Sequence, residues 1–288
     1  MEGFEHDGLY FDVVDSGPPD GDTVVLLHGF PQDSSSWAAV SQVLNLAGYR
    51  TLAPDQRGYS SGARPTRRQD YTDRHLVNDL WALMDAAGVD QAHVVGHDWG
   101  GGVAWWAAAD RPDRVRTLSV FSVPHPAALL TAMRRGQAFR SWYIPVFLVP
   151  GLAEQVFKPG SGRWDWFLRG LPSERVRHYG ERMAQPGAFT AALNWYRSMP
   201  AHALHPGVGD GAITVPTLFV WGTDDWTMTP SAAEHTRDYI SAPYTYRRLD
   251  GATHHLPETR ATEVTELLLA HLSEAHPGSA AAPDGRAP

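Results

Sequence analysis

The sequence contains no cysteine among its 288 residues, and this absence excludes several kinds of chemistry. Without thiols the chain forms no disulfide, binds no zinc through thiolates and has no cysteine nucleophile. Positive charge is also scarce, because 24 lysine and arginine residues face 32 aspartate and glutamate residues and Lys158 is the only lysine. Proteins that bind nucleic acid or anionic membranes usually carry a basic patch, so we expect a small or uncharged partner instead.

Long apolar segments are missing as well. No apolar run reaches the roughly 20 residues of a membrane-spanning helix. Residues 1–10 lack the basic and apolar regions of a signal peptide, and we therefore expect a cytoplasmic protein. The chain does have the material for a large core, since 43% of its residues are hydrophobic and 11% are aromatic. Its length suits one large α/β domain or two small ones.

Segments typical of strands alternate with segments typical of amphipathic helices. The run Thr23-Val-Val-Leu-Leu-His28 is apolar almost throughout, as in a strand that is covered on both faces. Further strands are predicted at 9–14, 50–54, 92–96, 115–123, 213–221 and 244–249, and helices at 35–46, 73–87, 99–109, 231–240 and 258–272. This alternation predicts an α/β fold, a mostly parallel sheet with helices on both faces and right-handed crossovers.

The alternation stops between residues 125 and 211, where the segments look helical and carry many aromatic side chains. A helical insertion between two strands of a parallel sheet lies over the carboxyl edge of that sheet, where ligands bind in open α/β folds. We therefore expect a core in two parts, 1–124 and 212–275, and a helical lid at 125–211. Residues 276–288 are rich in alanine, proline and glycine, and we expect a disordered tail there.

The most specific motif is Gly96-x-Asp98-x-Gly100, which follows a predicted strand and opens a predicted helix. This is the sequence form of a nucleophile elbow, a turn so sharp that the flanking positions must be small while the central side chain is exposed. The central residue is Asp98, whereas most elbows carry serine. The alternative interpretation is that Asp98 only caps the following helix, because aspartate is a good N-cap.

A second stretch, Gly58-Tyr-Ser60-Ser-Gly62, has the spelling of a serine elbow in the wrong surroundings. Polar residues precede it, and a polar segment follows it instead of an apolar helix. We interpret Ser60 as a loop residue, and we expect Asp55 and Arg57 to hold this loop through a charge pair.

An acid and a histidine follow the last two predicted strands. Asp225 and His254 each come three residues after a glycine, and each has a neighbour of the same type, Asp224 and His255. The glycine spacing favours Asp225 and His254. Nucleophile, acid and histidine in this chain order are typical of folds with a nucleophile elbow.

The segment His28-Gly-Phe30-Pro31 follows another central strand. Backbone N–H groups from such a loop and from the residue after the nucleophile form an oxyanion hole, which predicts Phe30 and Trp99 for this role. A tight turn between strand and helix would account for the same residues and is compatible with that role.

Together these motifs resemble the α/β-hydrolase-fold epoxide hydrolases of the soluble type, which use an aspartate nucleophile, and the match spans nearly the whole chain. The motifs are His28-Gly-Phe-Pro31, Asp55-Gln-Arg-Gly58, Gly96-His-Asp-Trp-Gly-Gly101, Val123-Pro-His-Pro126, Gly222-Thr-Asp-Asp225 and Gly251-Ala-Thr-His254. The resemblance implies the α/β-hydrolase fold with two lid tyrosines. Tyr196 matches the second tyrosine motif closely, Tyr143 matches the first more loosely, and Tyr179 is the alternative to Tyr143.

The resemblance also implies a reaction, the hydrolysis of a mainly hydrophobic epoxide to a vicinal diol through an ester of Asp98. Tyr143 and Tyr196 would activate the epoxide oxygen, and His254, oriented by Asp225, would activate the water that cleaves the ester. With Phe30 and Trp99, the two tyrosines would bind the substrate. The implied partners are the epoxide and water, without metal, organic cofactor, nucleic acid or membrane span, and the sequence assigns no oligomeric state.

Other classes share parts of this pattern. A haloalkane dehalogenase has the same fold and an Asp-Trp pair at the elbow, but often an asparagine where this chain has Phe30. A fluoroacetate-type dehalogenase has arginines near the nucleophile, where this chain has Trp99 and Gly102. The absence of serine at position 98 disfavours a serine esterase or haloperoxidase. A non-catalytic ligand-binding scaffold would usually have lost a triad member, and here all three are present.

Overall fold

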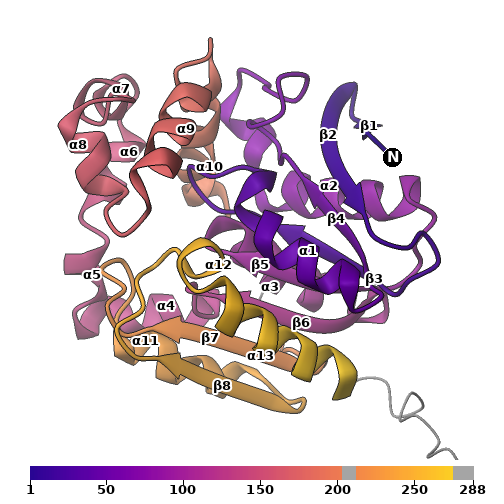
Figure 1. Cartoon of the computed structure of the whole chain (residues 1–288). Coiled ribbons are helices and arrows are strands. Elements are labelled where there is room, and N and C mark those ends of the chain that lie inside the picture. Colours follow the sequence, from indigo (N-terminus) through magenta and orange to yellow (C-terminus); the bar gives the residue numbers. More distant parts are fainter. Residues whose placement is uncertain (203–211, 275–288) are drawn as a thin grey trace, which may run out of the picture.

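A central sheet of eight strands organises the molecule (Figure 1). The computed structural model describes residues 1–202 and 212–274, so the predicted tail and the end of the predicted lid lie outside the described residues. The strand order is β1-β2-β4-β3-β5-β6-β7-β8. The strands are β1 (Gly3–His6), β2 (Leu9–Ser16), β3 (Thr23–Leu27), β4 (Arg50–Pro54), β5 (Ala92–His97), β6 (Val115–Phe121), β7 (Thr217–Gly222) and β8 (Tyr244–Leu249).

The pairing of these strands confirms the predicted mostly parallel sheet. β1 pairs with β2 and β2 with β4 in the antiparallel sense, and every pair from β4 to β8 is parallel. β3, β5 and β7 are buried along their whole length, as expected of central strands that are covered on both faces.

Helices cover the two faces of the sheet (Figure 1). α2 (Asp73–Ala86) and α3 (Trp99–Asp110) contribute side chains to one buried apolar cluster. α1 (Ala38–Leu46), α12 (Leu256–Thr259) and α13 (Ala261–Glu274) contribute to a second cluster. The doubly covered sheet that the sequence predicts is therefore present.

Several predicted boundaries are wrong for local reasons. The helix predicted at 258–272 is two helices, because the backbone leaves helical geometry at Arg260 (φ −137°, ψ 39°). The strand predicted from 213 begins at Thr217 and leaves only an isolated bridge between Ile213 and Ile240. The helix predicted at 231–240 is α11 (Pro230–His235) followed by a 3-10 turn, and a 3-10 turn precedes α1. The four-residue β1 was not predicted, since it has no apolar run.

Among the described residues between β6 and β7 there are seven α-helices, and we call Pro126–His202 the helical insertion. They are α4 (Pro126–Ala132), α5 (Gln137–Arg140), α6 (Tyr143–Leu148), α7 (Leu152–Val156), α8 (Gly162–Phe167), α9 (Ser173–Met183) and α10 (Ala188–His202). Figure 1 shows most of them gathered at one end of the sheet. No helix within residues 1–202 and 212–274 is long and apolar enough to span a membrane.

Candidate active site

Asp98 lies in a strained turn between β5 and α3. Its φ of 50° and ψ of −122° form a backbone conformation that residues other than glycine rarely adopt. A Cβ atom on Gly96 would overlap the carbonyl oxygen of Gly100, and one on Gly100 would overlap that of Leu27. These contacts explain why the elbow needs glycine on both sides of Asp98.

The Asp98 carboxylate points to the core loops and not to its own helix. Its Oδ1 accepts a hydrogen bond from the Phe30 amide at 2.8 Å, and its Oδ2 lies 3.3 Å from His254 Nε2. Although Asp98 occupies the N-cap position of α3, its side chain accepts no capping hydrogen bond from the backbone amides of that helix, all of which lie in the described part of the chain. The capping interpretation is therefore wrong.

His254 lies between two carboxylates. Its Nδ1 is 2.7 Å from Asp225 Oδ2, on the side opposite to Asp98. Asp225 is fully buried, and its Oδ1 accepts from the amide and hydroxyl of Thr227, both at 2.7 Å, and from the amide of Met228 at 3.1 Å. The neighbouring Asp224 is exposed. The structure thus brings together the three residues that the sequence predicts as a triad.

These contacts set the charges of the site. Burial lowers the pKa of His254, but the carboxylates of Asp225 and Asp98 outweigh burial and raise that pKa to about 10. Burial raises the pKa of Asp98, whereas the hydrogen bond and charge of His254 lower it, and the net effect is a lowered pKa. At neutral pH the site therefore holds an ionised Asp98 beside a protonated His254.

A small cavity opens beside the Asp98 carboxylate, between the core and the helical insertion. Its volume is about 10 Å³, room for roughly one water molecule. The core and the insertion both contribute to its walls, which are formed by Phe30, Asp98, Tyr143, Phe167, Tyr196, Trp226, Thr227, His254 and His255.

Both predicted tyrosines line this cavity. Tyr143 comes from α6 and Tyr196 from α10, and their ring centroids are 6.3 Å apart. Burial, together with the charge of Asp98, raises the pKa of both hydroxyls, so both are neutral hydrogen-bond donors at physiological pH. Tyr179, the alternative to Tyr143, lies elsewhere, because its hydroxyl donates to Glu258 Oε1 at 2.8 Å.

With this geometry in place, the chain can be compared with known proteins. Residues 22–261 match the family model described as alpha/beta hydrolase fold. This chain belongs to the α/β-hydrolase family. Within the family it is 33% identical over 311 aligned positions to epoxide hydrolase A of Mycobacterium tuberculosis, an alignment that covers 92% of this chain and 95% of the relative.

Other members of the family give the same result. Epoxide hydrolase 3 of Xenopus tropicalis is 32% identical over 93% of this chain and 76% of its own length. The crystal structure of epoxide hydrolase A from Mycobacterium thermoresistibile matches with a TM-score of 0.83 and 30% identity, over 94% of this chain and 97% of that one. These matches confirm the predicted α/β-hydrolase fold and the resemblance to the epoxide hydrolases. The relatives are enzymes of the hydrolase class, and so is this member of their family.

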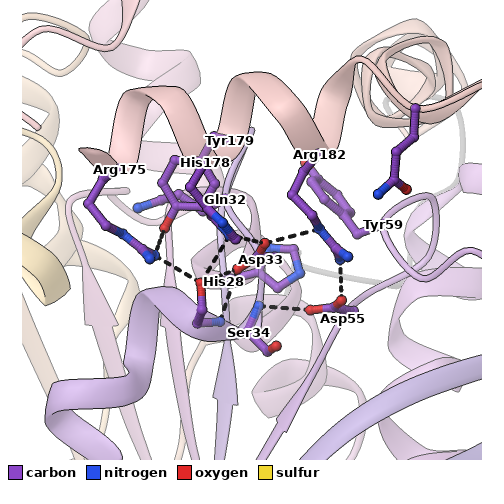
Figure 2. Close-up of polar contacts among 12 residues, drawn as sticks. His28, Gln32, Asp33, Ser34, Asp55, Tyr59, Arg175, His178, Tyr179 and Arg182 are labelled. Carbon is purple, nitrogen blue, oxygen red and sulfur yellow. Dashed lines mark hydrogen bonds and ion pairs between the residues drawn. The ribbon is translucent and has the colours of Figure 1, made fainter. Parts of the chain in front are cut away.

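A second polar cluster joins α9 of the insertion to the core (Figure 2). Arg175 Nε lies 2.6 Å from Glu258 Oε1, and His178 Nε2 lies 2.8 Å from Asp33 Oδ2. Arg182 pairs with Asp33 at 3.2 Å and also with Asp55. The insertion is therefore held on the core by charge pairs along this whole helix.

The predicted charge pair between Asp55 and Arg57 is wrong. Arg57 instead pairs with Asp79 through two hydrogen bonds of 2.7 Å, while Asp55 accepts from the Ser34 amide and pairs with Arg182. The two side chains point to different neighbours, because Asp55 faces the insertion and Arg57 faces α2. Ser60 is a loop residue as predicted, and its buried hydroxyl donates to the carbonyl oxygen of Asp55 at 2.8 Å.

Four wall residues of the cavity were not predicted from the sequence: Phe167, Trp226, Thr227 and His255. Trp226 and Thr227 follow Asp225 directly, and His255 follows His254, so proximity to a predicted site residue was the available signal. Phe167 had none, because it is one of many aromatic residues in the insertion.

Proposed function

We propose that this protein hydrolyses a mainly hydrophobic epoxide to a vicinal diol through a covalent ester of Asp98. One observation carries the proposal: an ionised carboxylate and two neutral tyrosine hydroxyls line the same small cavity. Relatives named epoxide hydrolase support it. The apolar walls Phe30, Phe167 and Trp226 suit an apolar substrate, and the helical insertion acts as the lid over it.

In the first step the Asp98 carboxylate attacks a carbon of the epoxide ring. Asp98 needs no base, because its lowered pKa keeps it ionised. The breaking C–O bond leaves an alkoxide, which is far more basic than a phenol. Tyr143 and Tyr196 donate hydrogen bonds to this oxygen and deliver its proton, an acid catalysis typically worth about 10²–10⁴-fold.

Ester formation then changes the charge beside His254. Asp98 becomes neutral, so one of the two carboxylates that raise the pKa of His254 is lost. His254 can now release its proton, and this proton replaces the one that a tyrosine delivered to the epoxide oxygen. Neutral His254 is the form that can accept a proton from water, and Asp225 stabilises the imidazolium that results.

In the second step the activated water attacks the side-chain carbonyl carbon of Asp98. Negative charge develops on the carbonyl oxygen, and the Phe30 amide already donates to Asp98 Oδ1 at 2.8 Å. The amide of Trp99, the first residue of α3, is the second donor of this oxyanion hole. The bond between the Asp98 carbonyl carbon and the substrate oxygen then breaks, this oxygen takes up the second proton of the water, and the diol leaves with the carboxylate of Asp98 restored.

The test is to stop the reaction at the ester. His254→Gln incubated with styrene oxide should accumulate an ester, seen as a mass increase of one substrate molecule on the peptide that holds Asp98. The double variant His254→Gln/Asp98→Asn is the matched control and should stay unmodified. An unmodified peptide in His254→Gln would refute the covalent mechanism.

Isotopic label and a second substrate class separate the alternatives. In H₂¹⁸O under single turnover, label should enter Asp98 before it enters the diol, and label that appears first in the diol would contradict the proposal. Bromide release from a bromoalkane without diol from the epoxide would instead identify a dehalogenase. Binding of the epoxide without turnover would identify a non-catalytic scaffold.

A further inference from the structure

Exposed apolar side chains are concentrated in the helical insertion. Of the thirteen large hydrophobic residues that are exposed within residues 1–202 and 212–274, eight lie between residues 130 and 166. Phe139 is 86% exposed, and Trp142 and Trp166 are 44% and 47% exposed. Single exposed apolar residues are common on protein surfaces, whereas a concentration of them indicates an interaction surface.

Four of these residues form a continuous surface, which we call the apolar patch: Phe139, Trp142, Val149 and Trp166. Only two residues separate α5 from α6. Along these two helices Phe139, Trp142 and Val149 recur at spacings of three and seven residues, as on one face of a helix. Trp166 of α8 adjoins this face, because its ring centroid lies 6.0 Å from that of Trp142. Figure 1 shows α5 and α8 at the same margin of the molecule.

Positive charge is concentrated in the same part of the chain. The insertion contains ten of the 24 arginine and lysine residues but only four of the 32 aspartate and glutamate residues. Its formal charge is therefore +6, while the rest of the chain carries −14. The expectation of a small or uncharged partner rested on the charge of the whole chain, −8, which conceals this division.

Exposed cations lie beside the apolar patch. Arg134 lies in the 3-10 turn just before α5, and Arg163 lies three residues before Trp166 on the same side of α8. Lys158 is exposed in the segment between α7 and α8. Within residues 1–202 and 212–274, none of these three cations forms an ion pair with a carboxylate. Asp165 is the one exposed acid between residues 130 and 166, so the surface around the patch is mainly positive.

Apolar side chains mixed with unpaired cations suit the surface of an anionic membrane. Tryptophan is enriched at the level of the lipid headgroups, and each arginine or lysine near an anionic lipid surface strengthens binding by roughly five-fold. A second copy of this chain suits the patch less well, because a two-fold interface would bring the same cations together. A polyanion such as nucleic acid would pair with the cations but offers few apolar groups to the patch.

We propose that the outer surface of the helical insertion, around the apolar patch, docks reversibly on an anionic lipid membrane. The patch enters the boundary between headgroups and acyl chains, and Arg134, Lys158 and Arg163 pair with lipid headgroups. The acidic core faces away from the membrane, because the anionic surface repels it. This docking does not depend on the proposed function.

The test is cosedimentation of the full-length protein with vesicles of phosphatidylglycerol and phosphatidylcholine in equal parts. The protein should bind these vesicles more tightly than vesicles of phosphatidylcholine alone, and salt should weaken the binding. Phe139→Ser/Trp142→Ser should lower the partition coefficient by on the order of 10-fold at every salt concentration. Arg134→Gln/Arg163→Gln should lower it by roughly 10- to 30-fold at low salt and by less at high salt.

Matched controls on the core separate docking from a general effect of charge or exposure. Leu46→Ser replaces a leucine of α1 that is 83% exposed. Arg74→Gln/Arg247→Gln removes two exposed arginines of the core and thus changes the net charge equally. Both controls should bind the anionic vesicles within about two-fold of the wild-type protein. Equal losses in the core variants and the patch variants would overturn the proposal.

Quenching of tryptophan fluorescence by lipids with brominated acyl chains shows whether the patch enters the bilayer. The wild-type protein should be quenched, and Trp142→Phe/Trp166→Phe should be quenched much less. Equal quenching of both proteins would contradict the docking surface, and so would the absence of binding to anionic vesicles at low salt. A dimer that Phe139→Ser abolishes, found without vesicle binding, would identify a second copy as the occupant. Binding to double-stranded DNA that is as tight as to vesicles and unaffected by Phe139→Ser would identify a polyanion site instead.

Discussion

Replacing Asp98 with asparagine should lower the pKa of His254 by about three units. Asparagine has nearly the shape of aspartate and keeps an oxygen for the Phe30 amide, so the variant removes a charge with little change in packing. It imitates the neutral Asp98 of the proposed ester. The experiment therefore measures whether ester formation can turn His254 from an acid into a base.

The distance between the two groups gives the magnitude. His254 Nε2 lies 3.3 Å from Asp98 Oδ2, and both side chains are at most 12% exposed. Unit charges about 4 Å apart attract by ~4 kcal/mol at the effective dielectric constant of about 20 that suits protein sites. One pKa unit corresponds to about 1.36 kcal/mol, so the shift is roughly three units. The pKa of His254 should thus fall from about 10 to roughly 7, with Asp225 still present.

The assay is a titration of the imidazole nitrogens by NMR in ¹⁵N-histidine-labelled protein. The sequence contains 14 histidines, so the His254 signals are assigned by comparison with His254→Gln. Asp224→Asn is the matched control, because this exposed neighbour of Asp225 makes no described contact with His254. It should leave the pKa of His254 near its wild-type value.

A pKa of His254 that stays near 10 in Asp98→Asn would refute this reasoning. Asp225 alone would then hold the proton, and formation of the ester could not free His254 to act as a base. Another group would have to activate the water.

Two further predictions concern the insertion. Tyr143→Phe and Tyr196→Phe should each slow ester formation, followed by stopped-flow tryptophan fluorescence, by about 10²–10⁴-fold, whereas Tyr179→Phe should change it little. Similar losses in all three would contradict the assignment. Arg182→Gln breaks ion pairs with two buried carboxylates, and because Arg182 itself is 28% exposed we expect a loss of about 2 kcal/mol in the free energy of unfolding by urea. Arg177→Gln, which replaces an exposed arginine of the same helix, should change the free energy of unfolding by less than about 0.5 kcal/mol. Equal losses in the two variants would argue against the ion pairs of Arg182.

The core of the candidate site could be predicted from local sequence. The elbow follows from sterics, because only glycine fits at positions 96 and 100 once the turn closes against backbone oxygens. Asp225 and His254 were found because parallel strands end at the same edge of a sheet, which places residues just after β7 and β8 close to Asp98.

The alternatives within the insertion needed the tertiary structure. Most of its helices are short and it contains many aromatic residues, so periodicity does not separate a tyrosine that lines the cavity from one that contacts Glu258. Tyr143 and Tyr179 differ only in what faces them, a cavity beside Asp98 or the carboxylate of Glu258. The resemblance to the epoxide hydrolases favoured Tyr143. The structure shows that Tyr143 lines the cavity and that the Tyr179 hydroxyl contacts Glu258.

The sequence by itself determined the parallel sheet, the elbow and the chain order of the three residues around His254, because each follows from local sterics or from the positions of strand ends. Tertiary structure alone decided the partners of charged side chains. Asp55 forms an ion pair with Arg182, which is 127 residues away, and the guanidinium of Arg169 packs on the ring of Trp226. A long flexible side chain pairs with whichever group lies close to it in the folded protein. Here the packing of the insertion on the core determines which groups are close.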